Sequence, residues 1–166
     1  MTTQSTPAAV IVTPADSLVI GAYGDEFRFH LTSEHTNGKF TLFTDITPPG
    51  GGPPPHYHAN EDETFTVIEG QAEFLLDDEW IAVPAGTTLH LPKGVRHTFR
   101  NVGCVPLRQL IKTSPSGFED FIAESEAEFS GGGNVDTARL AAIAAKHGIF
   151  FDGAHPNQGV TAMAAQ

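Results

Sequence analysis

Residues 50–70, which read GGGPPPHYHANEDETFTVIEG, decide how this chain folds. His56 and His58 are two positions apart, so on a strand both imidazoles point to the same face. Two neighbouring imidazoles can bind one metal ion through their ring nitrogens. Glu63 follows His58 at an odd offset, which would turn its side chain outward in an unbroken strand. We therefore expect residues 59–62 to form a turn or bulge that brings Glu63 to the same face as the two histidines.

A second informative stretch covers residues 86–101 and reads GTTLHLPKGVRHTFRN. Pro92 and Gly94 indicate a turn, because proline fixes its own φ angle and glycine tolerates positive φ. The residues after this turn alternate as in a strand that carries His97, which is thus a further candidate ligand.

Together the two stretches resemble the paired motifs of the cupin family. The first motif, G(x)5HxH(x)4E(x)6G, is matched by Gly50, His56, His58, Glu63 and Gly70, and the second, G(x)5PxG(x)2H(x)3N, by Gly86, Pro92, Gly94, His97 and Asn101. The resemblance implies an all-β fold, a double-stranded β-helix (jelly-roll) barrel. It also implies that one divalent metal ion per chain is bound by His56, His58, Glu63 and His97. These ligands suit Fe, Ni, Mn, Cu or Zn and do not choose among them.

The rest of the chain agrees with a barrel followed by helices. Its 17 glycines and 12 prolines separate short apolar runs, as expected of an all-β domain with many turns. We expect a flexible N-terminal arm over residues 1–16, the barrel over 17–113, and C-terminal helices with a tail, packed on the barrel, over 114–166. Ser116 and Glu119 form a capping-box pattern that predicts the start of the first helix.

Charge and composition limit the partners and the location. The net charge of −11 disfavours nucleic acid and anionic membrane surfaces as partners. The single cysteine, Cys104, cannot form an internal disulfide. We see no secretory signal in the first ten residues and no transmembrane stretch, so we expect a cytoplasmic protein.

For function, the chain is similar to small quercetin dioxygenase-like cupins. This resemblance implies a metal-dependent dioxygenase that acts on an aromatic or enolic small molecule with dioxygen, with Glu63 as both ligand and catalytic base. The alternative is a metal-containing protein that binds a small ligand without turnover. A sugar isomerase fits less well. Cupins of that kind usually have basic residues around the pocket for phosphate, and here Lys93 and Arg96 lie in a turn rather than on an evident inward face.

Other polar and apolar residues receive simpler interpretations. We interpret Glu61 and Asp62 as a solvated acidic turn, and treat the histidines outside the motifs as surface or packing residues; these are His30, His35, His90, His147 and His155. The apolar triplet Val10-Ile11-Val12 lies outside the barrel. We expect a homodimer in which it crosses over or pairs with a sheet edge, with pairing inside its own chain as the equal alternative.

Overall fold

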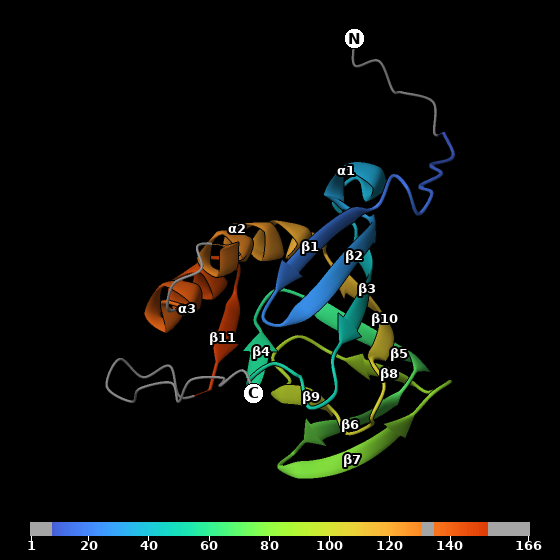
Figure 1. The fold of residues 1–166 in the computed structure, drawn as a ribbon. Helices are drawn as coiled ribbons and strands as arrows, with labels where there is room; N and C mark the ends of the chain where they lie inside the picture. Colours follow the sequence, from blue (N-terminus) through green and yellow to red (C-terminus); the bar gives the residue numbers. More distant parts are fainter. Residues whose placement is uncertain (1–7, 131–134, 153–166) are drawn as a thin grey trace.

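The structure is a computed structural model that describes residues 8–130 and 135–152, and it confirms the jelly-roll fold. Two antiparallel sheets enclose the core, and the helices lie to one side of them (Figure 1). The first sheet contains, in spatial order, β1 (Leu18–Ala22), β2 (Asp25–Leu31), β3 (Thr41–Thr47), β10 (Leu107–Ser114), β5 (Asp62–Glu69) and β8 (Thr88–Leu91). The second contains β11 (Ile149–Phe151), β4 (His56–His58), β9 (His97–Asn101), β6 (Gln71–Leu76) and β7 (Glu79–Pro84).

Strict alternation of buried and more exposed side chains builds the barrel interior. In β3 and β10 every second residue is buried, as the period of a strand requires. Phenylalanines join the two sheets: the rings of Phe65 on β5 and Phe74 on β6 meet edge to face, with centroids 5.2 Å apart. Such aromatic pairs add to the stability that burial of their area provides.

An Asn-Gly pair often forms a two-residue hairpin, because both residues tolerate positive φ. Asn37 and Gly38 adopt positive φ angles, of 52° and 77°, but they do not form such a hairpin. They end the short helix α1 (Ser33–Thr36), which lies between β2 and β3. The two strands still pair in antiparallel fashion. The Asn-Gly signal therefore marks a left-handed helix end within a longer connection.

The first C-terminal helix, α2 (Phe118–Ser130), packs against β1 and presents Phe118 to the barrel interior. The Phe118 ring stacks on Phe43 of β3 at 4.9 Å. Ser116 does not cap this helix, because the helix begins at Phe118 and the cap position is Gly117. The Ser116 hydroxyl instead accepts a hydrogen bond from Ser33. Glu119 turns instead toward α1 and β3, where its carboxylate accepts hydrogen bonds from the Ser33 N–H at 2.6 Å and from the Thr41 hydroxyl.

The second helix, α3 (Thr137–Lys146), leads into β11, a strand that no pattern in the sequence predicts. The Asp136 side chain caps α3 by accepting from the N–H groups of Ala138 and Arg139. After α3, β11 pairs with β4 and so covers the strand that carries two of the candidate ligands. Its residues Ile149–Phe151 are too few for periodicity to reveal a strand.

Residues 8–16 of the predicted arm contain no strand, and Ile11 is 85% exposed. Residues 1–7 of the arm and the tail from 153 onward, with His155, lie outside the described residues. Within the described part of the chain, no helix is long and apolar enough to cross a membrane.

Candidate metal centre

Four side chains from three strands converge inside the barrel. One ligand atom from each of His56, His58, Glu63 and His97 lies within 4.8 Å of the other three, and all four residues are buried. β4 supplies the first two histidines, β5 supplies Glu63, and β9 places His97 directly opposite His56. Residues 59–61 interrupt the strand between His58 and β5, which returns Glu63 to the inner face as predicted.

Backbone carbonyls fix the tautomer of two of the imidazoles. His56 Nδ1 lies 2.8 Å from the carbonyl oxygen of Pro54, and His97 Nδ1 lies 2.9 Å from that of Val95. A carbonyl can only accept, so each Nδ1 carries the proton and each Nε2 keeps a free lone pair. A neutral imidazole oriented in this way is ready to bind a metal through Nε2.

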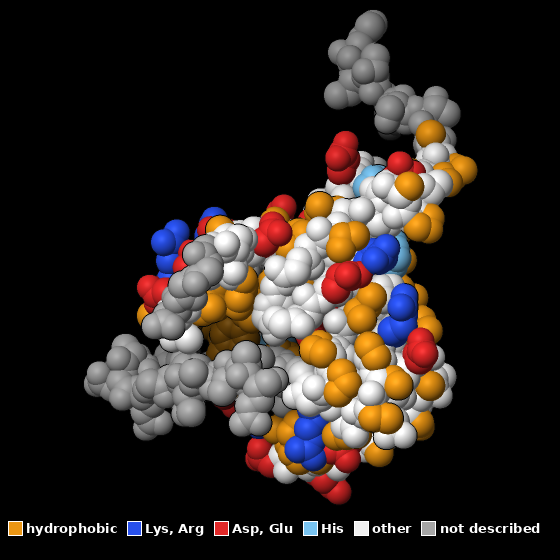
Figure 2. Space-filling model, viewed as in Figure 1, with side chains coloured by type: hydrophobic (Ala, Val, Ile, Leu, Met, Phe, Trp, Pro, Cys, Tyr) orange, Lys and Arg blue, Asp and Glu red, His pale blue; other side chains and the backbone are white. Residues whose placement is uncertain are grey.

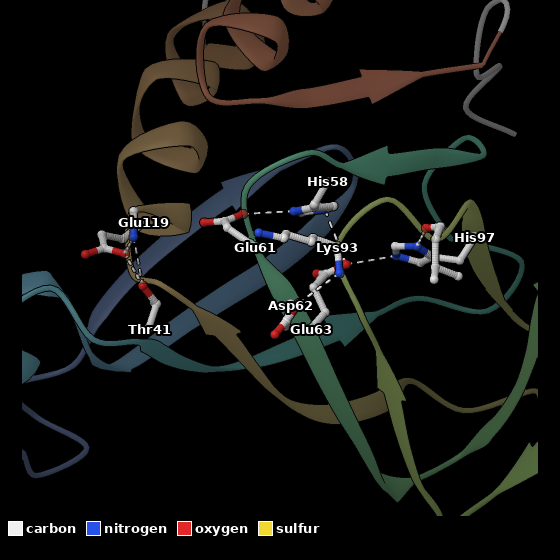
Figure 3. Close-up of polar contacts among 10 residues, drawn as sticks. Thr41, His58, Glu61, Asp62, Glu63, Lys93, His97 and Glu119 are labelled. Carbon is white, nitrogen blue, oxygen red and sulfur yellow. Dashed lines mark hydrogen bonds and ion pairs between the residues drawn. The ribbon is translucent and has the colours of Figure 1, made fainter.

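The third imidazole is oriented by a carboxylate, and here the sequence interpretation of Glu61 is wrong. Glu61 is not solvated: it is only 6% exposed, and its Oε2 lies 2.8 Å from His58 Nδ1. Figure 3 shows Glu61 on one side of the His58 ring and Glu63 on the other. Such carboxylate–histidine pairs accompany metal-binding histidines and raise their basicity. The one feature of the sequence that indicates this contact is the acidic residue three positions after His58.

Two of the candidate ligand atoms lack hydrogen-bond partners, an arrangement that a cation would complete. Glu63 Oε2 lies 2.9 Å from His97 Nε2 and 3.3 Å from His58 Nε2. Nevertheless, neither Glu63 Oε2 nor His97 Nε2 forms a hydrogen bond. With the proton on Nδ1, a lone pair faces a carboxylate oxygen, and two acceptors so close need a cation or a proton between them. Three imidazoles and one carboxylate therefore fit a divalent metal ion.

The electrostatics also favour a neutral His56 beside an ionised Glu63. Burial, with the neighbouring His97 and His58, lowers the pKa of His56 to about 3. Burial would by itself raise the pKa of Glu63, but the adjacent histidines, His58 first, outweigh it and bring this pKa to about 2. For His58, burial acts to lower the pKa, yet the carboxylates of Glu63 and Glu61 raise it overall.

The cluster opens into an interior cavity walled by aromatic rings. Figure 2 shows hydrophobic side chains gathered in a recess below α2 and α3. The rings that line the cavity include Phe27, Phe43, Phe65, Phe99, Phe118 and Phe121. Two acidic residues, Asp25 of β2 and Asp45 of β3, line the same cavity. No motif marks them, although strand alternation places both on inward-facing positions.

The remaining described histidines lie outside the cluster, in agreement with their simple interpretation. His30 bonds the Thr44 hydroxyl, His90 bonds that of Thr64, His147 contacts Glu124, and His35 caps α1. Asp62, the other acidic rival of Glu63, accepts from the N–H of Lys93 at the surface.

Comparison with known proteins identifies the domain. The cupin domain family model matches residues 43–111. A polyketide synthase protein, CurC, from Streptomyces cyaneus is 39% identical over 70 residues, 42% of this chain and 46% of that protein. Quercetin 2,3-dioxygenase from Bacillus subtilis is 32% identical over 78 residues, 46% of this chain and 23% of the enzyme. The first three curated relatives are matched over 39%, 62% and 46% of their own lengths.

Solved structures agree on the fold. The polyketide cyclase RemF from Streptomyces resistomycificus superposes with a TM-score of 0.57 at 22% identity, over 66% of this chain and 81% of that chain. The nucleoside dehydratase Pac13 from Streptomyces gives a TM-score of 0.56 at 15% identity, over 68% of this chain and 88% of that chain. Identities this low establish a shared architecture only, because one fold hosts many chemistries.

Proposed function

We propose, from the premise that this chain contains a cupin domain, that it is a metal-dependent enzyme acting on an aromatic or enolic small molecule, in the manner of a quercetin 2,3-dioxygenase. The observation that carries the proposal is the buried cluster of three imidazoles and one carboxylate at the wall of an aromatic cavity. The proposed ligands are His56, His58, Glu63 and His97.

A divalent ion held by these four residues would act as a Lewis acid toward a hydroxyl or carbonyl oxygen of the substrate. The protein supplies the rest of the site. Glu61 and the carbonyls of Pro54 and Val95 hold the three imidazoles in orientation through their Nδ1 atoms. Glu63, which is ionised at neutral pH, is the group we assign to accept the substrate's hydroxyl proton.

The cavity walls favour a flat, uncharged substrate. Phe43 of β3 and Phe118 of α2 stack on each other there, with an interplanar angle of 11°. No lysine or arginine is among the described residues that line the cavity, so a sugar phosphate would find no counter-charge. Arg96 is instead paired with Asp78 and Asp152 outside it. These features count against the sugar isomerase alternative.

A second candidate function uses the same cluster without dioxygen. The likeness to the polyketide synthase protein CurC favours an enolic polyketide as the substrate, and cyclisation of such a molecule needs no dioxygen. The two acidic residues in the cavity, Asp25 and Asp45, would suit the proton transfers of such a reaction.

Oxygen uptake distinguishes the candidates. The freshly purified protein is first analysed for bound metal and then incubated with quercetin, catechol and a β-diketone in an oxygen electrode. We expect near-stoichiometric metal and metal-dependent oxygen consumption with at least one compound. If metal-loaded protein consumes no oxygen with any of them, the dioxygenase proposal fails. Conversion of a poly-β-ketone under anaerobic conditions would then support the cyclase, and tight binding without conversion would support a ligand-binding protein.

A further inference from the structure

The cavity has a second polar site, four residues along the strands from the metal cluster. Strand register places Glu63, Thr113 and Thr41 in one row across β5, β10 and β3. The next inward row consists of Phe65, Ile111 and Phe43, and the row after it contains Val67, Gln109 and Asp45. Four residues of strand span about 13 Å, a distance comparable to a two- or three-ring aromatic molecule.

Asp45 and its neighbour Asp25 line this cavity, and each has one buried carboxyl oxygen that no protein group satisfies. Asp45 is 1% exposed and Asp25 is 9% exposed. The Thr47 hydroxyl donates to Asp45 Oδ2 at 3.1 Å, but Oδ1 of Asp45 and Oδ1 of Asp25 form no hydrogen bond with any protein group. Buried polar atoms are nearly always partnered, so two free oxygens at a cavity wall mark positions where a ligand or water completes the bonding.

Their surroundings disfavour ionisation of both carboxyl groups at once. Burial raises the pKa of Asp25 to about 7, and burial together with the nearby Asp25 raises the pKa of Asp45 well above its usual value. The other titratable groups facing the cavity are Tyr23, whose hydroxyl bonds Ser125, and the metal cluster. No lysine or arginine among the described lining residues offsets these shifts, which favour the protonated form of the pair.

We propose that Asp25 and Asp45 form the second binding point for the substrate, a pair of buried carboxyl groups that hydrogen-bonds a neutral hydroxyl or carbonyl group remote from the metal. The pair would repel a carboxylate or phosphate at that end. The inference rests on the proposed function, and it narrows the substrate to an uncharged aromatic or enolic molecule with oxygen at both ends.

Two flavonols distinguish binding at the metal end of the cavity from binding at the end that holds Asp25 and Asp45. Quercetin and 3-hydroxyflavone share the hydroxy-ketone that would face the metal, but only quercetin carries hydroxyl groups on its other rings. Dissociation constants are measured without oxygen for metal-loaded wild type, Asp45→Leu, Asp45→Asn and Asp25→Leu. Gln109→Leu is the matched control, because Gln109 is fully buried opposite Asp45 on β10 and its amide atoms also lack partners, but it does not line the cavity.

We expect Asp45→Leu and Asp25→Leu each to weaken quercetin binding about tenfold, the effect of leaving a ligand hydroxyl without its buried partner. Binding of 3-hydroxyflavone should change little, and Asp45→Asn should restore most of the quercetin affinity because an amide still donates and accepts. The two leucine variants serve as independent tests if one of them does not fold.

Equal losses for both flavonols, or no loss for either, would overturn the inference, as would a wild type that binds neither. The result is independent of turnover. If the wild type binds quercetin selectively through the pair but consumes no oxygen, the binding site is supported. The dioxygenase proposal is then refuted.

Discussion

Glu61 Oε2 lies 2.8 Å from His58 Nδ1, so a carboxylate outside the cupin motif orients one of the motif histidines. Both side chains are almost completely buried, at 7% and 3% exposure. A charge-assisted hydrogen bond of this kind is stronger in the protein interior than at the surface. The pair therefore couples the turn between β4 and β5 to the metal centre.

This contact predicts that Glu61→Gln weakens metal binding while the four ligands remain in place. The amide is nearly isosteric but loses the charge that raises the basicity of His58, and changes to such partners typically reduce metal affinity about 10–100-fold. Competition with a chelator measures the affinity. Glu69→Gln, on the exposed end of β5, is the matched control. Unchanged affinity in Glu61→Gln would show that the contact has no role in metal binding.

The contrast between Glu61 and Glu63 illustrates what the sequence could and could not reveal. The spacing of the motif placed Glu63 correctly, because strand period and a turn decide which way it points. The burial of Glu61 depends on how the turn folds back onto His58, which no short-range pattern reports. For the same reason β11 was missed: three residues become a strand only because β4 offers them an edge. Asp25 and Asp45 follow the alternation of their strands, but nothing in the sequence links them to one cavity.

Acid should weaken both metal binding and the metal-free fold. Neutral imidazole binds metal, so protons compete with the ion. In the metal-free protein the pKa of His56 is about 3, below the value of about 6.5 expected when unfolded. The unfolded chain then binds more protons, and the stability that His56 contributes is lost as pH falls from about 6.5 toward 3. Urea unfolding of chelator-treated protein at several pH values measures this loss, and His56→Gln should flatten the dependence.

The stability that Asp25 and Asp45 contribute should change with pH in the opposite direction to that of His56. Because the pKa of Asp25 is raised to about 7, its contribution is present below the unfolded value, near 4, and is lost as pH rises toward 7. Asp45→Asn should therefore remove part of the destabilisation seen near neutral pH. If the stability of Asp45→Asn changes with pH in the same way as that of the wild type, the assigned pKa directions are contradicted.

Glu119 should be a major anchor of α2 on the barrel. Its carboxylate accepts from the Ser33 N–H, the Thr41 hydroxyl and the Gly117 N–H. We expect Glu119→Ala to reduce the free energy of unfolding by about 2–3 kcal/mol, because it leaves buried donors unpaired. Denaturant unfolding measures the change, with the exposed Glu126→Ala on the same helix as control. Similar stability in the two variants would show that α2 is held by its apolar contacts alone.

The N-terminal arm remains our proposed dimer contact. Val10 and Ile11 are 49% and 85% exposed, so the described part of one chain leaves them uncovered. We expect the full chain to sediment as a homodimer and a variant lacking residues 1–16 to sediment as a monomer. If the shortened protein remains dimeric, the arm is not part of the interface. If the full chain is monomeric, the predicted homodimer is wrong.

Glu63 provides the sharpest test of the proposed chemistry. Glu63→Gln keeps the size of the side chain and one carbonyl oxygen as a ligand, but it removes the charge and the proton acceptor. With three histidines retained, we expect the metal to stay bound, though more weakly. Oxygen uptake with a neutral flavonol at saturating metal should fall by about two to four orders of magnitude, the effect of losing a general base.

A comparison of neutral and ionised substrate distinguishes the role of Glu63 as a base from its role as a metal ligand. A flavonol ionised at higher pH has already lost its hydroxyl proton, so Glu63→Gln should impair its turnover much less. With the pKa of Glu63 near 2, the wild-type carboxylate itself does not titrate over the pH range compared. If the variant loses activity equally on neutral and ionised substrate while its metal content is intact, Glu63 serves as a ligand and not as the base. Full activity on the neutral form would exclude both a catalytic and a necessary ligand role for this carboxylate.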